Sequence, residues 1–209
     1  MLKIHILGGP GNGKTTLAGA LSSRFHVPHY ELDQLGRKNG MRDAAYIEDA
    51  FAIAEQPSWV TEGIFLIWTE PLLSQADYIV LLEVSWPVAA WRIISRHISK
   101  SLRGTNPYPG IDGVKSLFKL LKDTRDYCLN KESSDTEESI RMYLEEYGES
   151  AEPPDTERLL ARLEKYGDVS LAPTAAFVRR YLEQYQEKVF LVRNNADRER
   201  LLGLLTQHR

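Results

Sequence analysis

The sequence is poor in cysteine, and its histidines are not clustered. Cys128 is the single cysteine among 209 residues, so an internal disulfide is excluded, and no grouping of cysteine with histidine has zinc-site spacing. We expect each of the five scattered histidines to be a surface or packing residue: His5, His26, His29, His97 and His208. These absences exclude disulfide scaffolds and zinc modules, and they favour a reducing cytoplasm.

A strong net charge and long apolar runs are also missing. Lys and Arg total 26 against 29 Asp and Glu, a formal net charge of -3, which gives no general case for a nucleic-acid or membrane partner. No stretch approaches the length of a transmembrane helix, and the N-terminus lacks the features of a secretory signal. We therefore expect a cytoplasmic protein with no membrane partner, and a nucleic-acid partner is disfavoured.

The first half of the chain alternates between two kinds of periodicity. Short apolar segments rich in branched side chains predict strands at 2–7, 29–33, 58–63 and 76–84. Helical periods separate them, at 14–26, 44–56, 69–75 and 87–103. Because strands that alternate with helices form parallel βαβ units, this pattern predicts an α/β fold with helices on both faces of the sheet.

The alternation stops after the Pro/Gly-rich loop 104–113. From 114 to 186 the sequence shows helical periodicity and no convincing strand, until the apolar segment 187–195 and a closing helix. The heavily acidic part, 132–157, is typical of a solvated helical face with a turn, and secondarily of a partner surface. A strand after so long a helical stretch predicts one domain whose core is interrupted by a helical, partly acidic insertion at 131–186.

The segment "GGPGNGKTT" follows the first strand and opens the first helix. Gly8, Gly13, Lys14 and Thr15 satisfy the phosphate-binding pattern G-x-x-x-x-G-K-[ST] in the strand, turn and helix context that it requires. The glycines let backbone N–H groups approach a triphosphate, and the helix N-terminus attracts the same anion. Lys14 would reach the β- and γ-phosphates, and the Thr15 hydroxyl would hold Mg²⁺. The nucleotide-binding residues predicted here are Gly8, Gly9, Pro10, Gly11, Asn12, Gly13, Lys14, Thr15 and Thr16.

A second acid should help to hold Mg²⁺ from the end of a neighbouring strand, and two candidates exist. Glu83 ends the apolar segment "YIVLLEV" and fits the string pattern of four apolar residues and an acid. Glu62 ends "WVTEG", the third strand, which is where small kinases carry this acid. We prefer Glu62, while the sequence leaves the choice between the two open.

Two further features point to the same edge of the sheet. Asp33 stands at the predicted C-terminal end of the second strand, where open parallel sheets bind ligands, although helix caps and turns also use Asp. A basic stripe of Arg92, Arg96, Lys100 and Arg103 lies on one face of the helix before the Pro/Gly loop. Because cations assist phosphoryl transfer, a catalytic role is favoured for Arg92 and Arg96 and stays open for the other two.

Five segments taken together resemble a known group, the adenylate-kinase-like P-loop kinases. Within that group the sequence is similar to the small bacterial DNA topology modulation proteins. The shared segments are "GGPGNGKTTLAGAL", "PHYELDQL", "WVTEGIF", "ADYIVLLEVSWPVAAWRIISR" and "VFLVRNNADRERLL". The resemblance covers residues 1 to about 125 and 187 to 209, and it leaves 131–186 without a counterpart.

The resemblance implies a P-loop three-layer sandwich with a five-stranded parallel sheet in the order 2-3-1-4-5. It implies ATP and Mg²⁺ as cofactors, a lid-like loop at 104–112, and Arg92 and Arg96 at the base of that lid. One of these arginines would lie near the adenine and the other near the phosphates, and the loop around Asn194 and Asn195 would also lie near the adenine. Asp33 and Glu62 would flank the acceptor.

The leading functional hypothesis is a kinase that moves the γ-phosphoryl group of ATP to a small acceptor. The predicted catalytic residues are Lys14, Asp33, Glu62, Arg92 and Arg96, with Thr15 and Glu62 at the metal. The alternative is a nucleotide-dependent regulatory ATPase or switch whose insertion, 131–186, binds a macromolecular partner. The sequence does not name the acceptor.

The phosphate-loop assignment predicts the effect of Lys14→Ala. Removing this cation from the β- and γ-phosphates should strongly reduce ATP affinity or turnover while the fold is retained. Titration calorimetry with MgATP measures the affinity, and circular dichroism checks the fold. Undiminished binding and turnover in a folded variant would contradict the assignment.

Overall fold

The computed structural model describes residues 1–38, 43–105, 110–131, 134–147, 154–167 and 170–207. Five parallel strands form one sheet in the order β2-β3-β1-β4-β5, which confirms the predicted strand order. The strands are β1 (Lys3–Leu7), β2 (His29–Glu31), β3 (Trp59–Gly63), β4 (Tyr78–Leu82) and β5 (Val189–Val192). Together with the glycine-rich turn between β1 and the first helix, this is the P-loop three-layer fold.

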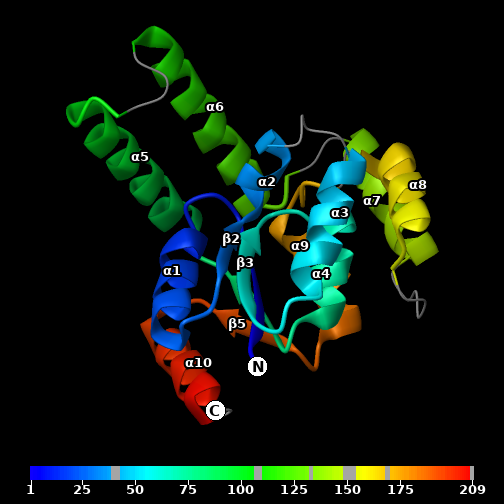
Figure 1. Ribbon diagram of the computed structural model, residues 1–209. Helices are drawn as coiled ribbons and strands as arrows, with labels where there is room; N and C mark the ends of the chain where they lie inside the picture. The colour runs from blue at the N-terminus through cyan, green and yellow to red at the C-terminus, as the bar shows by residue number, and fades with distance from the viewer. Residues whose placement is uncertain (39–42, 106–109, 132–133, 148–153, 168–169, 208–209) are drawn as a thin grey trace.

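Helices cover both faces of the sheet (Figure 1). Those up to the sheet's fourth strand are α1 (Lys14–Phe25), α2 (Leu32–Lys38), α3 (Asp43–Ala54), the 3-10 turn η1 (Ile67–Thr69) and α4 (Glu70–Gln75). The later ones are α5 (Trp86–Leu102), α6 (Ile111–Cys128), α7 (Ser134–Tyr147), α8 (Thr156–Tyr166), α9 (Ala175–Tyr181), the turn η3 (Leu182–Tyr185) and α10 (Asn195–Gln207). None of the helices in the described ranges is long and apolar enough to cross a membrane.

Strand side chains alternate between two hydrophobic clusters on opposite faces of the sheet. Ile4, Ile6 and Val60 pack with Leu21 of α1 and Leu201 of α10 on one face. The other cluster is built from α3, α4 and the helices α7 to α9 against the opposite side of the strands. Since side chains point to alternate faces along a strand, this assignment also fixes the direction of the polar residues at the strand ends.

His5 shows the same alternation in the middle of β1. Its ring is fully buried, and Nδ1 lies 2.7 Å from the Thr61 hydroxyl on the neighbouring strand. Burial lowers the pKa of His5 to about 3, so the ring is neutral over the physiological range. His5 is therefore a packing residue, as the sequence indicated.

The helices between 134 and 181 are part of the larger core cluster. Tyr143 of α7, Leu159 of α8 and Tyr181 of α9 are each buried in it, and the rings of Tyr143 and Tyr181 contact each other. The acidic side chains of α7, among them Glu137, Glu138 and Glu145, are exposed. The acidic side of α7 is thus a solvated helical face, and the apolar side of this helix packs in the core.

A buried ion pair joins this helical segment to the rest of the molecule. Arg162 of α8 donates from Nη1 to Glu70 Oε2 of α4 over 2.5 Å, and the two side chains are 6% and 5% exposed. The guanidinium also lies over the Tyr147 ring, 4.2 Å from its centroid. Because removing one partner leaves a buried charge without compensation, this pair ties α8 to α4 strongly.

Glu70→Ala should therefore destabilise the protein by about 3–5 kcal/mol, since it removes the carboxylate that pairs with the Arg162 guanidinium in the core. Urea unfolding measures the change. The exposed pair of Lys115 with Asp112, 3.9 Å apart and 75% and 87% exposed, provides the control, and Lys115→Ala should cost less than about 0.5 kcal/mol. Equal effects of the two substitutions would contradict the role of the buried pair.

Candidate functional site

The loop between β1 and α1 forms the floor of a cavity of about 770 Å³ at the carboxyl edge of the sheet. Gly11 and Gly13 adopt φ values of +77° and +92°, a region that glycine enters without strain. α1 begins directly after Gly13, so its first N–H groups lie at the cavity. The glycine turn predicted between β1 and α1 is therefore present, and it leads into a helix N-terminus of the kind that attracts anions.

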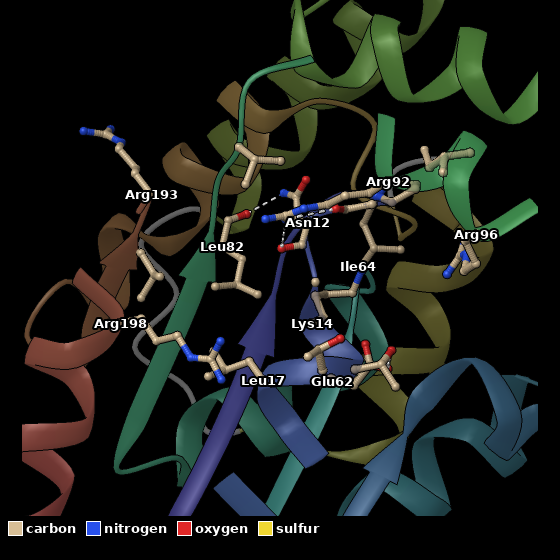
Figure 2. Close-up of a pocket in the computed structure, with 18 of the residues that line it drawn as sticks. Asn12, Lys14, Leu17, Glu62, Ile64, Leu82, Arg92, Arg96, Arg193 and Arg198 are labelled. Carbon is tan, nitrogen blue, oxygen red and sulfur yellow. Dashed lines mark hydrogen bonds between the residues drawn. The ribbon is translucent and has the colours of Figure 1, made fainter. Parts of the chain in front are cut away.

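Residues of α1, β4 and α5 contact this loop (Figure 2). Lys14 donates from Nζ to the Gly9 carbonyl over 3.2 Å, and Asn12 donates from Nδ2 to the Leu82 carbonyl at the end of β4 over 2.6 Å. Arg92 of α5 donates from Nη1 to the Gly11 and Asn12 carbonyls over 3.3 and 3.1 Å. These bonds fix the backbone of the loop from the α1, β4 and α5 sides.

The Thr15 hydroxyl donates to Glu62 Oε1 over 2.7 Å. Glu62 points this way because its register partner on β1 is Ile6 and because Val60, two residues earlier, faces α1. Glu31 is the register partner of Glu62 on β2, and both line the cavity. Burial raises the pKa of Glu62, with the Thr15 hydrogen bond and Lys14 opposing the rise.

Glu83 has a different set of partners. It follows Leu82, which faces α1, so strand alternation directs Glu83 to the opposite side of the sheet. There its two carboxylate oxygens bind Arg179 Nε of α9 at 2.5 Å and Arg193 Nε after β5 at 3.2 Å. Of the two acids that the sequence left open, only Glu62 contacts Thr15 in the described structure.

Asp33 lines the cavity, but from a different element than predicted. β2 ends at Glu31, and Asp33 lies in the first turn of α2, where its carboxylate complements the positive end of the helix. The prediction of a strand over 29–33 was therefore two residues too long. Burial lowers the pKa of Lys14, and the nearby carboxylates of Glu62 and Asp33 oppose this effect.

The basic stripe of α5 divides along its length. Arg92 and Arg96 line the cavity, whereas Lys100 and Arg103 are not among its lining residues. Arg96 lies near enough to Lys14 to contribute to the lowering of the Lys14 pKa. In the predicted lid loop, 106–109 lies outside the described residues. Gly110 precedes α6, and Ile111 and Asp112 form its first turn.

The far end of the cavity is formed by β5 and α10. Asn194 lines it, and its Oδ1 accepts a hydrogen bond from the Asp197 N–H in the first turn of α10. Arg198 of the same turn points toward Leu17 of α1, whereas Arg193 points away (Figure 2). Gly8 and Gly9 of the predicted set do not line the cavity, while Pro10 and Thr16 do.

Sequence reasoning missed several lining residues, notably Glu31, Leu120 and Arg198. Glu31 is the residue beside Glu62 in the register of β2 with β3, and the sequence alone does not give that register. Arg198 follows the last strand in the first turn of the closing helix, which is the same edge of the sheet. Leu120 carries no such signal, since its position depends on how α6 returns to the body.

Comparisons with known proteins add descriptions of similar folds. No protein-family model matches the chain, and no curated protein sequence does. A shikimate kinase from Bacteroides thetaiotaomicron aligns at 18% identity, over 62% of this chain and 82% of its own, with a TM-score of 0.36. A gluconokinase from Sinorhizobium meliloti 1021 aligns at 16% identity, over 89% and 97%, with a TM-score of 0.40.

The separate surroundings of Glu62 and Glu83 predict different effects on metal-dependent binding. Glu62→Gln should weaken the Mg²⁺ dependence of ATP affinity by about tenfold, because the neutral amide is a poorer partner for the metal and its ligands. Glu83→Gln should leave that dependence unchanged. Calorimetric titration of ATP with and without Mg²⁺ measures both, and a loss confined to Glu83→Gln would contradict this assignment.

Proposed function

We propose that the protein is a kinase that transfers the γ-phosphoryl group of MgATP to a small acceptor. The contact between Thr15 and Glu62, beside Lys14 in a cavity that extends to Asp33, is the observation that carries this proposal. A site that only bound a nucleotide would need Thr15, Glu62 and Lys14, without a further carboxylate. The cavity continues past them to a further carboxylate, which gives space for an acceptor.

The loop fits a polyphosphate. An added β-carbon would come within 2.6 Å of the Leu82 carbonyl at Gly8 and within 2.8 Å of the Ala89 carbonyl at Gly11, so the glycines permit a backbone course that side chains would block. The phosphates would accept hydrogen bonds from the N–H groups of this loop and of the α1 N-terminus. Lys14, which now donates to the Gly9 carbonyl, would turn to the β- and γ-phosphates.

Thr15 and Glu62 would hold Mg²⁺, since this ion prefers oxygen ligands and usually binds through one or two protein groups plus phosphate oxygens. When bound, it would neutralise charge on the β- and γ-phosphates. Glu62 must be ionised for this role. Lys14 and the Thr15 hydroxyl favour the ionised form, and burial opposes it.

Asp33 would receive the proton of the acceptor hydroxyl or orient that hydroxyl by a hydrogen bond. Its exposed carboxylate belongs to the cavity and lies close enough to Lys14 to affect the pKa of that group. Arg96 would stabilise negative charge on the transferring group. Arg92, through its bonds to loop carbonyls, would keep the phosphate-binding turn in shape, and Asn194 would contact the adenine.

In this proposal residues 1–209 form one kinase-like domain, with 104–112 as a lid-like loop and 131–186 as a helical insertion. The described helices of the insertion bury apolar residues such as Tyr143 and Tyr181 in the main core, which favours one domain over two. The resemblance to the DNA topology modulation proteins rests on the sequence segments and stays a prediction.

Incubation with MgATP and a broad panel of hydroxyl, nucleoside and nucleotide acceptors tests the proposal, with phosphorylated products identified by mass spectrometry. For the acceptor found, Arg96→Ala should lower kcat on the order of a hundredfold with little change in ATP affinity, because its charge acts mainly in the transition state. Arg103→Ala, on the same helix but outside the cavity, is the matched control.

Two results would count against the proposal. Tight ATP binding with no product from any acceptor would remove the case for a kinase. A loss of ATP affinity in Arg96→Ala that equals its loss of kcat would make Arg96 a binding residue.

A further inference from the structure

The second glycine of the phosphate-binding loop faces an aromatic ring from a distant helix. A β-carbon built on Gly9 would lie 2.5 Å from Cε1 and 2.7 Å from Cδ1 of Tyr127. Real β-carbons essentially never approach other atoms so closely. The ring of Tyr127 therefore occupies the space where any other residue at position 9 would place its side chain.

Gly9 differs in this respect from the other loop glycines. Gly8, Gly11 and Gly13 have φ values of +151°, +77° and +92°, a region that side chains rarely adopt. Gly9 is not among the residues with positive φ, so its backbone conformation would accept alanine. The obstacle at Gly9 is the Tyr127 ring, whereas at Gly11 both the backbone and the Ala89 carbonyl stand in the way.

Tyr127 is held in place on the other sides. It is 6% exposed and belongs to the larger core cluster. Its pKa is raised above the usual value, first by burial and then by the nearby groups of Cys128 and Glu83. A ring so enclosed cannot swing away cheaply, because protein cores are close-packed.

The same helix reaches the cavity. Leu120, about two turns before Tyr127 on α6, lines the nucleotide cavity, and the buried Thr124 lies between them on the inner side of the helix. α6 packs along α5, and the two helices extend together from the body (Figure 1). α5 in turn binds the loop through Arg92, so both helices of this pair contact the phosphate-binding loop.

Gly9 is also the hydrogen-bond acceptor for Lys14. Its carbonyl accepts hydrogen bonds from Lys14 Nζ over 3.2 Å and from the Asn12 N–H over 3.3 Å. A displacement of Gly9 would therefore move the acceptor of both bonds. The contacts run from the Tyr127 ring through Gly9 to the lysine ammonium.

We propose that Tyr127 is a positioning residue for nucleotide binding: its ring sets the course of the loop at Gly9, and it links that course to α6. This inference rests on the proposed nucleotide-binding function. The ring acts by its shape, so the conservative variant Tyr127→Phe should bind MgATP as the unaltered protein does.

The test is a double-variant cycle measured by calorimetric titration with MgATP. Gly9→Ala should weaken binding by about tenfold or more, because the loop must shift away from the ring. Tyr127→Ala alone should also weaken binding, since the loop then lacks the ring that sets its course. Gly9→Ala combined with Tyr127→Ala should bind as Tyr127→Ala does and more tightly than Gly9→Ala, since the added β-carbon then has space. In the matched control, Gly11→Ala combined with Tyr127→Ala should bind no more tightly than Gly11→Ala alone, because the obstacle at Gly11 is Ala89.

Thermal unfolding separates positioning from packing. The variant that combines Gly9→Ala with Tyr127→Ala should recover affinity while its Tm stays as low as that of Tyr127→Ala, because the lost ring leaves a cavity. Tyr127→Val, which keeps an apolar side chain, replaces the alanine variant if that variant does not fold. Unchanged affinity in Gly9→Ala, or no recovery in the double variant, would overturn the proposal.

Hydrogen exchange tests the link to α6. MgATP should slow amide exchange in 111–128 of the unaltered protein, and this protection should be smaller in Tyr127→Ala at saturating MgATP. Equal protection in both would overturn the link. A failure of the unaltered protein to bind MgATP would instead overturn the proposed function, and the positioning role with it, so the two failures are distinguishable.

Discussion

Three glycines in the turn from β1 into α1, Gly8, Gly9 and Gly11, have no room for a side chain, and the site depends on this lack of space. The loop is enclosed by the end of β4 at Gly8, by α6 at Gly9 and by α5 at Gly11. Enclosure from these sides fixes the backbone, and a fixed backbone can present N–H groups to an anion without reorganisation. The positions of Lys14 and Thr15 follow, because α1 starts where the loop ends.

Strand alternation then decides which polar residues meet at this loop. The sequence predicted the strands and the glycine-rich turn, because both are local patterns of glycine, apolar residues and period. The strand order came from the resemblance to the P-loop kinases. Side-chain alternation separates Glu62 from Glu83. Glu62 stands two residues after Val60, which faces α1, whereas Glu83 stands one residue after Leu82, which also faces α1. The string pattern that favoured Glu83 ignored this parity, and the preference for Glu62 rested on chain order instead.

Other features could not be predicted, for physical reasons that differ. Asp33 was assigned to the end of a strand predicted over 29–33, but α2 begins at Leu32 and the tertiary fold overrides so short a signal. The pairing of Glu70 with Arg162 joins residues 92 positions apart. The contact of Tyr127 with Gly9 is equally remote in sequence, and one chain carries no information on such pairs unless the fold is known.

The two arginines on Glu83 have a consequence for how this protein can be divided. Arg179 belongs to α9, in the helical segment before β5, and Arg193 to the turn that leads into α10 beside the cavity, and both bind the same carboxylate. That helical segment is therefore not a detachable module. A shortened chain that lacked it would leave Glu83 with half of its counter-charge, and would expose the apolar side of α3 and α4 to water. The exposed acidic face of α7 is the part of this segment where side chains can be exchanged without disturbing the contacts that position the phosphate-binding loop.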